Sequence, residues 1–181
     1  SVLKLRPIQI ATDPLPSEEI SEILPKGHTI SDSRRLIMYA RREPDDRIVF
    51  GGIGYELPNG AAGGCHWLRQ DAARIFPQIS KERWQYAWSG KIAVTEDHIP
   101  HLHEPEPALF AGLGYNGRGV AMSLVMGDAL AQRAMGAEVE SLPFTPAPIR
   151  AFKFGRIQEA GAVLGMHVMR ALDMQEVARA S

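Results

Sequence analysis

Residues 108–120 read ALFAGLGYNGRGV, an apolar segment that runs directly into four closely spaced glycines. A short apolar run bounded by breakers is typical of a buried strand, so residues 108–113 predict a short strand. Residues 118–135 then carry apolar side chains near helical spacing, which predicts a helix. The succession of strand, glycine loop and helix decides how the rest of the chain is interpreted.

The glycines of this loop match a known spacing. Gly112, Gly114 and Gly117 form a literal GxGxxG, the spacing of dinucleotide-binding loops. That fingerprint also needs a second parallel strand with an acid about 20 residues further on. Glu138 and Glu140 instead lead into Ser-Leu-Pro, which disfavours the usual dinucleotide fold. A glycine loop that enters a helix N-terminus still offers backbone N–H groups and a positive dipole end to an electron-rich ligand.

Small side chains recur at every fourth position of the predicted helix, at Gly119, Ser123, Gly127 and Ala131. Glycine inside a helix costs up to about 1 kcal/mol relative to alanine, so this small-residue stripe indicates a need for close packing. Contact with another helix or sheet and contact with a cofactor explain the stripe equally well.

The composition bounds the possible partners and compartment. The 181 residues are 45% hydrophobic and 23% charged, as in one globular domain, and the net charge of −1 gives no field that would attract nucleic acid. The longest uncharged stretches are shorter than the roughly 18 apolar residues that a membrane-spanning helix needs. A single cysteine, Cys65, suits a reducing compartment. We therefore expect a cytoplasmic protein that binds neither nucleic acid nor membranes.

The remaining sequence predicts an α+β fold, with a mixed or antiparallel sheet flanked by helices. Breakers and periodicity predict a strand over 3–10, a short helix over 17–24, a hairpin of 36–40 with 47–52, a loop over 55–64, a helix over 67–76, a long strand over 83–94 and an amphipathic helix over 154–172. On the long strand, Trp84, Tyr86 and Trp88 are expected on one face. Residues 1–181 form a single module without repeats or linkers.

Three further groups of residues each allow a functional and a purely structural interpretation. His98, His101 and His103, with Asp97, Glu104 and Glu106, suit a divalent metal, but Pro100, Pro105 and Pro107 favour an exposed irregular turn. The pair Cys65–His66 resembles a nucleophile with its base, although adjacent side chains rarely face each other. Residues 31–35, Ser-Asp-Ser-Arg-Arg, predict a solvated turn or an arginine pair that binds a carboxylate or phosphate.

Several segments together resemble one family. They are Ala11–Leu15, Ser31–Arg35 with Tyr39 and Arg41, Phe50–Gly52, Arg74–Pro77, Trp88–Gly90, Thr95–Pro100 and Leu113–Gly119. In this order they resemble the FAD-dependent oxidoreductases of the D-amino-acid-oxidase-like class, which includes glycine oxidase, sarcosine oxidase and, with the greatest resemblance, gamma-glutamylputrescine oxidase. The resemblance covers only the family's C-terminal part, without the N-terminal nucleotide-binding half. Because Ser1 leads directly into a strand pattern, we expect a fragment.

The resemblance implies a role for each part of the chain. Residues 1–87 correspond mainly to the substrate domain, 88–136 to a flavin-facing strand, loop and helix, and 137–181 to a C-terminal tail and helix. The cofactor-binding residues are expected to be Gly114, Tyr115, Asn116, Gly117, Arg118 and Gly119, whose backbone packs against the flavin. The FAD is expected to be non-covalent, since Cys65 does not match the position of attachment. The isolated chain is expected to bind FAD poorly and to be inactive.

The resemblance also implies the chemistry. The substrate is a small amine or amino acid, which Tyr39, Arg41, Trp88 and Lys91 are expected to contact. Hydride transfer from the carbon beside nitrogen to flavin leaves an imine that water hydrolyses, and hydrogen peroxide is released. No catalytic base is assigned.

Two alternative functions remain. One is a non-catalytic subunit or ligand-binding module whose partner supplies the FAD-binding half. The other is a metal-dependent hydrolase that uses the histidine cluster.

Overall fold

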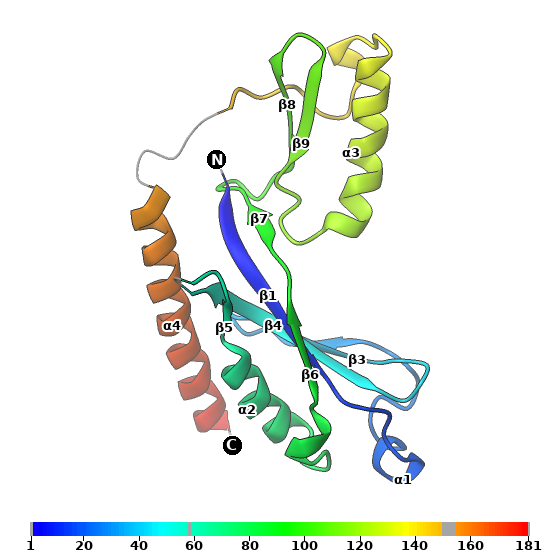
Figure 1. The fold of residues 1–181 in the computed structure, drawn as a ribbon, viewed down its shortest axis with the longest axis vertical. Coiled ribbons are helices and arrows are strands. Elements are labelled where there is room, and N and C mark those ends of the chain that lie inside the picture. The colour runs from blue at the N-terminus through cyan, green and yellow to red at the C-terminus, as the bar shows by residue number, and fades with distance from the viewer. Residues whose placement is uncertain (1, 58, 150–154, 181) are drawn as a thin grey trace. The chain divides into compact units, whose positions relative to one another are not determined.

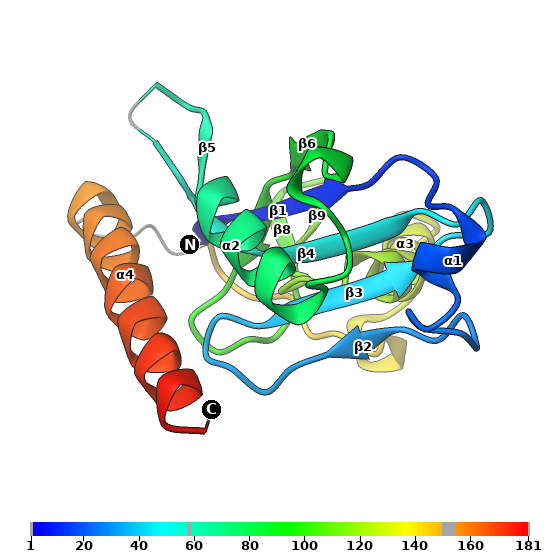
Figure 2. The same ribbon diagram turned by 90° about the horizontal axis from the view of Figure 1, so that it is seen from below.

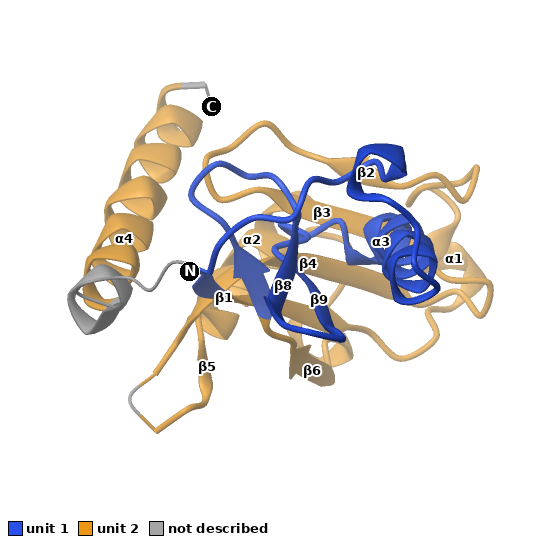
Figure 3. Cartoon of the chain, turned by 90° about the horizontal axis from the view of Figure 1, so that it is seen from above, with its two compact units in different colours: residues 1–4, 92–159 blue, residues 5–91, 160–181 orange. Residues whose placement is uncertain are grey.

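The computed structural model describes residues 2–57, 59–149 and 155–180, so Pro58 in the predicted loop and Phe154 at the predicted helix start lie outside the described residues. The chain divides into two compact units, coloured separately in Figure 3. Unit 1 comprises residues 1–4 and 92–159, and unit 2 comprises residues 5–91 and 160–181.

Unit 2 is built on an antiparallel sheet with the strand order β2-β3-β4-β1-β6 (Figures 1 and 2). The strands are β1 (Leu3–Ala11), β2 (Ile30–Ser31), β3 (Met38–Arg42), β4 (Ile48–Glu56) and β6 (Tyr86–Ser89), and β5 (Ala62–Gly63) pairs with β4. The predicted hairpin is therefore confirmed as β3 and β4, joined by a turn at Glu43–Asp46. The predicted α+β class with a mainly antiparallel sheet is confirmed as well.

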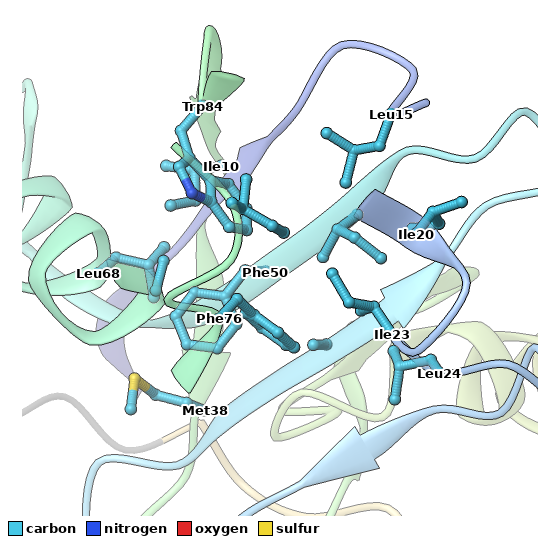
Figure 4. Packing of buried hydrophobic residues seen from close by; sticks show 14 of the residues in the cluster. Ile10, Leu15, Ile20, Ile23, Leu24, Met38, Phe50, Leu68, Phe76 and Trp84 are labelled. Carbon is cyan, nitrogen blue, oxygen red and sulfur yellow. The ribbon is translucent and has the colours of Figure 1, made fainter. Parts of the chain in front are cut away.

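One face of this sheet forms the main hydrophobic core (Figure 4). Alternate strand residues such as Ile8, Ile10 and Phe50 are at most 1% exposed, as expected for a strand with one buried face. The helices α1 (Ser17–Ile20) and α2 (Cys65–Ile75) contribute to the same core. The Phe50 ring meets the Phe76 ring edge-on, with 5.9 Å between centroids, a favourable arrangement for aromatic pairs.

The predicted long strand over 83–94 is wrong. The segment forms a 3₁₀ turn, η1 (Lys81–Arg83), then β6, and then β7 (Ile92–Val94), which also pairs with β1. Trp84 leaves the extended conformation, with φ −79° and ψ 69°, and is buried in the core against Phe50 and Phe76. Tyr86 and Trp88 lie on β6 and stay almost half exposed. The three aromatic residues do not share a face because the strand begins only after Trp84.

The C-terminal helix α4 (Gly155–Ala180) confirms that the predicted segment is helical and extends it, but the expected amphipathic character is not confirmed, since apolar side chains such as Leu164 and Val168 are 67% and 52% exposed. Its Asp173 is buried and accepts hydrogen bonds from the backbone N–H groups of Arg35 and Leu36 at 3.2 and 3.1 Å, and from the Arg35 guanidinium at 3.0 Å. Arg35 also binds Glu176 at 2.7 Å. The arginine pair at 34–35 thus binds carboxylates of its own chain. Of the two alternatives for residues 31–35, the structure supports the arginine pair that binds a carboxylate.

Unit 1 consists of a two-stranded hairpin and one long helix. The hairpin pairs β8 (His101–Glu106) with β9 (Leu109–Leu113), the helix is α3 (Gly119–Ala134), and a 3₁₀ turn η2 (Val139–Ser141) follows. Met126 and Ala129 of α3 are fully buried against Leu102 of β8. The predicted strand, glycine loop and helix are confirmed. Within the described residues, no helix is long and apolar enough to cross a membrane.

Candidate functional site

The glycine loop between β9 and α3 is held in a left-handed backbone conformation. Gly114, Asn116 and Gly117 have φ values of 78°, 54° and 81°. Gly114 is buried, and a Cβ atom added there would collide with the Cγ2 atom of Thr95. Both the backbone angle and the neighbour therefore require glycine at position 114.

The Asn116 side chain fastens this loop to the segment around Thr95. Its Oδ1 accepts a hydrogen bond from the Thr95 N–H at 2.8 Å, and its Nδ2 donates to the Gly114 carbonyl. Asparagine tolerates the left-handed conformation better than most residues, which suits its place in the loop. The side chain of Asn116 is thus used to shape the loop, and the sequence signal for this role is the Asn-Gly pair at the turn.

The loop ends at the N-terminus of α3, which has no side-chain cap. Arg118 is the N-cap residue, but its guanidinium donates to the His98 carbonyl at 2.8 Å instead of capping the helix. The first N–H groups of a helix lack partners inside the helix, and the dipole makes this end positive. The segment from Gly117 to the first turn of α3 therefore suits an acceptor-rich, electron-rich group.

The turn beside the loop contains a carboxylate whose pKa is lower than usual. Asp97 accepts a hydrogen bond from the Ile99 N–H at 3.1 Å, and this bond, followed by that from His101, lowers the pKa of Asp97 to about 2. Because this is below the unfolded value of about 3.9, the carboxylate stabilises the fold above about pH 4 and loses that effect as the pH falls toward 2.

We expect Asp97→Asn to flatten the pH dependence of the melting temperature between about pH 2 and pH 4, because the substituted side chain no longer titrates. Thermal unfolding followed by circular dichroism at several pH values measures this slope. Glu96→Gln, at an exposed neighbour, is the control and should keep the wild-type slope. An unchanged slope in Asp97→Asn contradicts the assignment.

The histidine cluster is divided among other partners. His101 pairs with Asp97 at 3.1 Å, His103 donates from Nδ1 to the Ala147 carbonyl at 2.6 Å, and Glu104 binds Arg133. No group of three or more histidine, cysteine, aspartate or glutamate side chains in the described part of the chain is placed to hold a metal ion. The expected irregular turn is wrong for residues 101–106, which form β8. Proline is tolerated there because a two-stranded sheet has only edge strands.

The Cys65–His66 pair is not arranged as a nucleophile and base. Cys65 begins α2 and packs against the hydrophobic core, whereas the His66 ring lies 5.5 Å from the Trp67 ring. The two side chains therefore diverge, as expected for adjacent residues.

The sheet face opposite the core carries two of the predicted substrate residues in one row. The register places Tyr39 opposite Gly51, Gly51 opposite Gln9 and Gln9 opposite Trp88. We call these four residues the cross-strand row. Neighbours in register share a face, so the row runs across β3, β4, β1 and β6. Neither Gln9 nor Gly51 was predicted as a substrate-site residue, although Gly51 lies in the segment Phe50–Gly52 that resembles the family. The sequence signals for these two residues are the alternation along residues 3–10 and the Gly-Gly pair in β4.

The Tyr39 ring lies over Gly51, where an added Cβ would overlap the ring. Burial raises the pKa of Tyr39, and the hydrogen bond with Gln9 only partly opposes this. The phenol therefore stays protonated at neutral pH and remains a hydrogen-bond donor. Trp88 is 45% exposed at the other end of the row and presents an apolar ring.

The two predicted cationic residues are less well placed for a substrate. Arg41 binds Glu43 at 2.6 Å, and with Tyr39 it lines a hollow of about 230 Å³ beside β2. Lys91 follows β6 outside the cross-strand row and pairs with Glu56 at 3.5 Å. Burial would raise the pKa of Glu56, but Arg6 and Lys91 together lower it. Each cation thus already has a carboxylate partner.

A family model described as "FAD dependent oxidoreductase" matches residues 1–133. The chain belongs to this family. The expected resemblance is confirmed, and the family implies FAD as the cofactor of the complete enzyme. The uncapped N-terminus of α3 fits such a cofactor, because the first N–H groups of the helix suit the electron-rich edge of a flavin ring. Within the loop, the N–H groups of Asn116 and Arg118 already donate to the Ala93 and Tyr115 carbonyls.

Individual relatives agree with the family. The chain is 26% identical over 174 residues to the probable oxidoreductase OrdL of Haemophilus influenzae and 24% identical over 150 residues to the gamma-glutamylputrescine oxidoreductase of Escherichia coli. These alignments cover 94% and 81% of this chain but only 39% and 34% of the relatives. The fold resembles that of glycine oxidase from Geobacillus kaustophilus, with a TM-score of 0.59 and 22% identity over 83% of this chain and 40% of that one.

Proposed function

We propose that this chain is part of an FAD-dependent oxidase of amines or amino acids, and that it supplies the substrate-facing sheet and the loop at the flavin ring. The observation that carries the proposal is the cross-strand row, which offers a neutral phenol and an exposed indole on the open face of the sheet in a member of this family. The names of two similar proteins, gamma-glutamylputrescine oxidoreductase and glycine oxidase, both refer to compounds with an amine nitrogen.

The chemistry that FAD supplies when bound is acceptance of a hydride from the carbon beside the substrate nitrogen, after which water hydrolyses the imine and oxygen is reduced to hydrogen peroxide. The residues of this chain position the substrate and stabilise negative charge on the cofactor. The first N–H groups of α3 and its positive dipole end favour negative charge on a group at Gly117–Gly119. Tyr39 donates a hydrogen bond from its protonated phenol, and Trp88 excludes water from an apolar portion of the substrate.

The arrangement favours an amine over a strict amino-acid substrate. A carboxylate-binding site needs a free cation, and Arg41 and Lys91 are paired with Glu43 and Glu56. A substrate carboxylate would have to replace one of these partners. We therefore propose Tyr39 and Trp88 as the main substrate contacts, with Arg41 and Lys91 in supporting roles.

A screen of amines against the complete enzyme tests the proposal. The complete enzyme is obtained from the native source, or by joining this chain with the part of an OrdL relative that the alignment leaves uncovered. Hydrogen peroxide release with polyamines, their acylated forms, glycine, sarcosine and D-amino acids is measured with a coupled peroxidase. Turnover of an amine together with a flavin absorption spectrum supports the proposal; a flavin-loaded enzyme that oxidises none of these compounds contradicts it.

One alternative proposal is that this chain is a subunit whose separate partner supplies the FAD-binding half; coverage of 39% and 34% of two relatives is compatible with it. In that case the 181-residue chain purifies from its native source with a second, flavin-binding polypeptide. Non-covalent FAD and a cytoplasmic location remain part of the proposal in either case.

We expect Tyr39→Phe to raise the KM for the amine about 3- to 10-fold, because one neutral hydrogen bond contributes about 1 kcal/mol. Steady-state kinetics of peroxide release measure this change. Tyr86→Phe is the matched control, since Tyr86 lies on the same face but the Arg47 guanidinium lies over its ring, 5.1 Å from the ring centroid. Equal effects of both substitutions would remove Tyr39 from the substrate site.

A further inference from the structure

One side of α2 and the turn η1 border a hollow of about 460 Å³ in unit 2. Arg69, Gln70 and Ala73 line it from α2, where a spacing of three and four residues places them on one side of the helix. Lys81 of η1 and Trp84, which directly follows η1, complete the lining. We call this space the α2 hollow. Its volume lies within the range of about 300 to 1,000 Å³ that is usual for small-molecule sites.

The α2 hollow carries two cations that have no carboxylate partner. Arg69 and Lys81 are both exposed, and neither forms an ion pair within the part of the chain that the structure describes. Lys81 helps to lower the pKa of its neighbour Glu82, but hydrogen bonds are the larger causes of that shift. By contrast, Arg41 and Lys91 are each paired with a carboxylate. Positive charge at the α2 hollow therefore remains available to a ligand.

The Arg69 guanidinium is already oriented by the backbone. Its Nη1 donates a hydrogen bond to the Trp84 carbonyl at 2.7 Å. A guanidinium carries five N–H donors in one plane, so most of them remain free, and their geometry matches the two oxygens of a carboxylate. A group that is held in place before the ligand arrives lowers the entropic cost of binding.

The indole N–H of Trp84 is a hydrogen-bond donor without an acceptor. Trp84 is 3% exposed, and its ring lies against Phe50 and Phe76 in the hydrophobic core (Figure 4). Its Nε1 is buried and has no partner among the described residues, although a buried indole N–H usually finds one. Because the exposed side chains of Arg69 and Lys81 beside it are long and can shift, an acceptor that enters the α2 hollow can supply the missing partner.

We propose that the α2 hollow binds a small organic anion that carries carboxylate beside an apolar group. The two cations and the indole N–H are all donors, so they select a group that only accepts, as an ionised carboxylate does. Ala73 and the Trp84 ring add an apolar lining, which favours an organic anion over inorganic phosphate. The inference is independent of the proposed function, because α2 covers the core side of the sheet and the cross-strand row lies on the other face.

An NMR titration of the full 181-residue chain tests the proposal. The probes are phenylacetate, phenylsuccinate, the neutral phenylacetamide and inorganic phosphate. The chain has three tryptophans, and Trp84→Phe identifies the indole N–H signal of Trp84 in a proton–nitrogen correlation spectrum. We expect phenylsuccinate to shift this signal saturably, with a Kd of about 1 mM or lower. Phenylacetate, with one charge, should bind more weakly, and phenylacetamide should not bind.

Substitution of the two cations shows whether they hold the anion. Arg69→Gln and Lys81→Gln are each expected to raise the Kd for phenylsuccinate at least about fivefold. Lys26→Gln is the matched control, at an exposed lysine of the same unit, and should leave the Kd unchanged. Arg69→Gln also removes a hydrogen bond of the fold, so the melting temperature of each variant is measured. If Arg69→Gln unfolds the chain, Lys81→Gln alone decides the outcome.

Several results would overturn the inference. One is the absence of a saturable shift of the Trp84 signal with either carboxylate. Another is binding of phenylacetamide as tight as that of phenylacetate, since the ring alone would then be recognised. Phosphate that binds as tightly as phenylsuccinate would assign the hollow to inorganic anions, and a shift at Trp88 without one at Trp84 would place the ligand at the cross-strand row. Equal weakening by Lys81→Gln and Lys26→Gln would reduce the effect to general charge attraction.

Discussion

Replacing Asp71 with alanine is expected to lower the free energy of unfolding of the chain by about 3 to 5 kcal/mol, the range for breaking a buried ion pair. Asp71 is 1% exposed and binds Arg74 at 2.7 Å, Arg170 of α4, and Arg34 at 3.6 Å. Arg34 keeps Asp32 as a partner, so most of the cost falls on Arg170, which is 12% exposed. A desolvated cation without its counter-charge is unfavourable, and the docking of α4 on α2 suffers directly.

Urea unfolding followed by circular dichroism measures the loss. Asp71→Asn keeps the size and some hydrogen bonds, so it should lie between wild type and Asp71→Ala. Asp128→Ala serves as the control: Asp128 is exposed on α3 and accepts a hydrogen bond from Gln132 in the same helix, so we expect a change within about 0.5 kcal/mol. A loss below about 1 kcal/mol in Asp71→Ala would show that the three arginines are adequately solvated without it.

The elements that depend on neighbouring residues could be predicted from the sequence. The turn at Glu43–Asp46, the helix α2 and the succession of β9, glycine loop and α3 all follow from breakers and periodicity, because turn chemistry and helical spacing act over a few residues. The resemblance to the family rested on the same local segments, and the family match confirms it.

Contacts between distant residues could not be predicted in this way. Trp84 continues the alternation of the aromatic residues in the sequence, but burial against Phe50 and Phe76 places it in the core. The pairing of Arg35 with Asp173 spans 138 residues, and no local pattern indicates it. Strand order also decides the cross-strand row, since Gln9 and Trp88 become neighbours only when β6 pairs with β1.

For the small-residue stripe, the need for close packing could be predicted from the sequence, but the packing partner could not. Sequence alone indicated close packing and could not distinguish a helix, a sheet or a cofactor as the partner. The structure shows that the stripe lies on the exposed side of α3, because Met126 and Ala129 occupy the side that faces the hairpin. Which side of an amphipathic helix is buried depends on the hairpin it meets, and that is not encoded in the helix.

Gly114→Ala is expected to weaken FAD binding by the complete oxidase at least about tenfold, which corresponds to about 1.4 kcal/mol. Alanine at φ 78° costs roughly 1 to 2 kcal/mol, and its Cβ would collide with Cγ2 of Thr95. Relief of the collision moves either the loop or the Thr95 segment, and both are joined through Asn116. The N–H groups that lead into α3 then lose their placement. Titration of the apoenzyme with FAD, followed by flavin fluorescence, measures the change.

Two variants separate the local collision from backbone strain. Gly60→Ala has the same kind of strain, with φ 79°, but its Cβ would meet no atom within 4 Å, so FAD binding should not change. Thr95→Ser removes the methyl group and keeps the hydroxyl that donates to the Ile99 carbonyl at 3.0 Å. The double variant Thr95→Ser/Gly114→Ala should therefore recover part of the FAD affinity. If Gly114→Ala binds FAD as tightly as wild type, the loop does not position the flavin; if the double variant shows no recovery, the collision with Thr95 is not the cause of the loss.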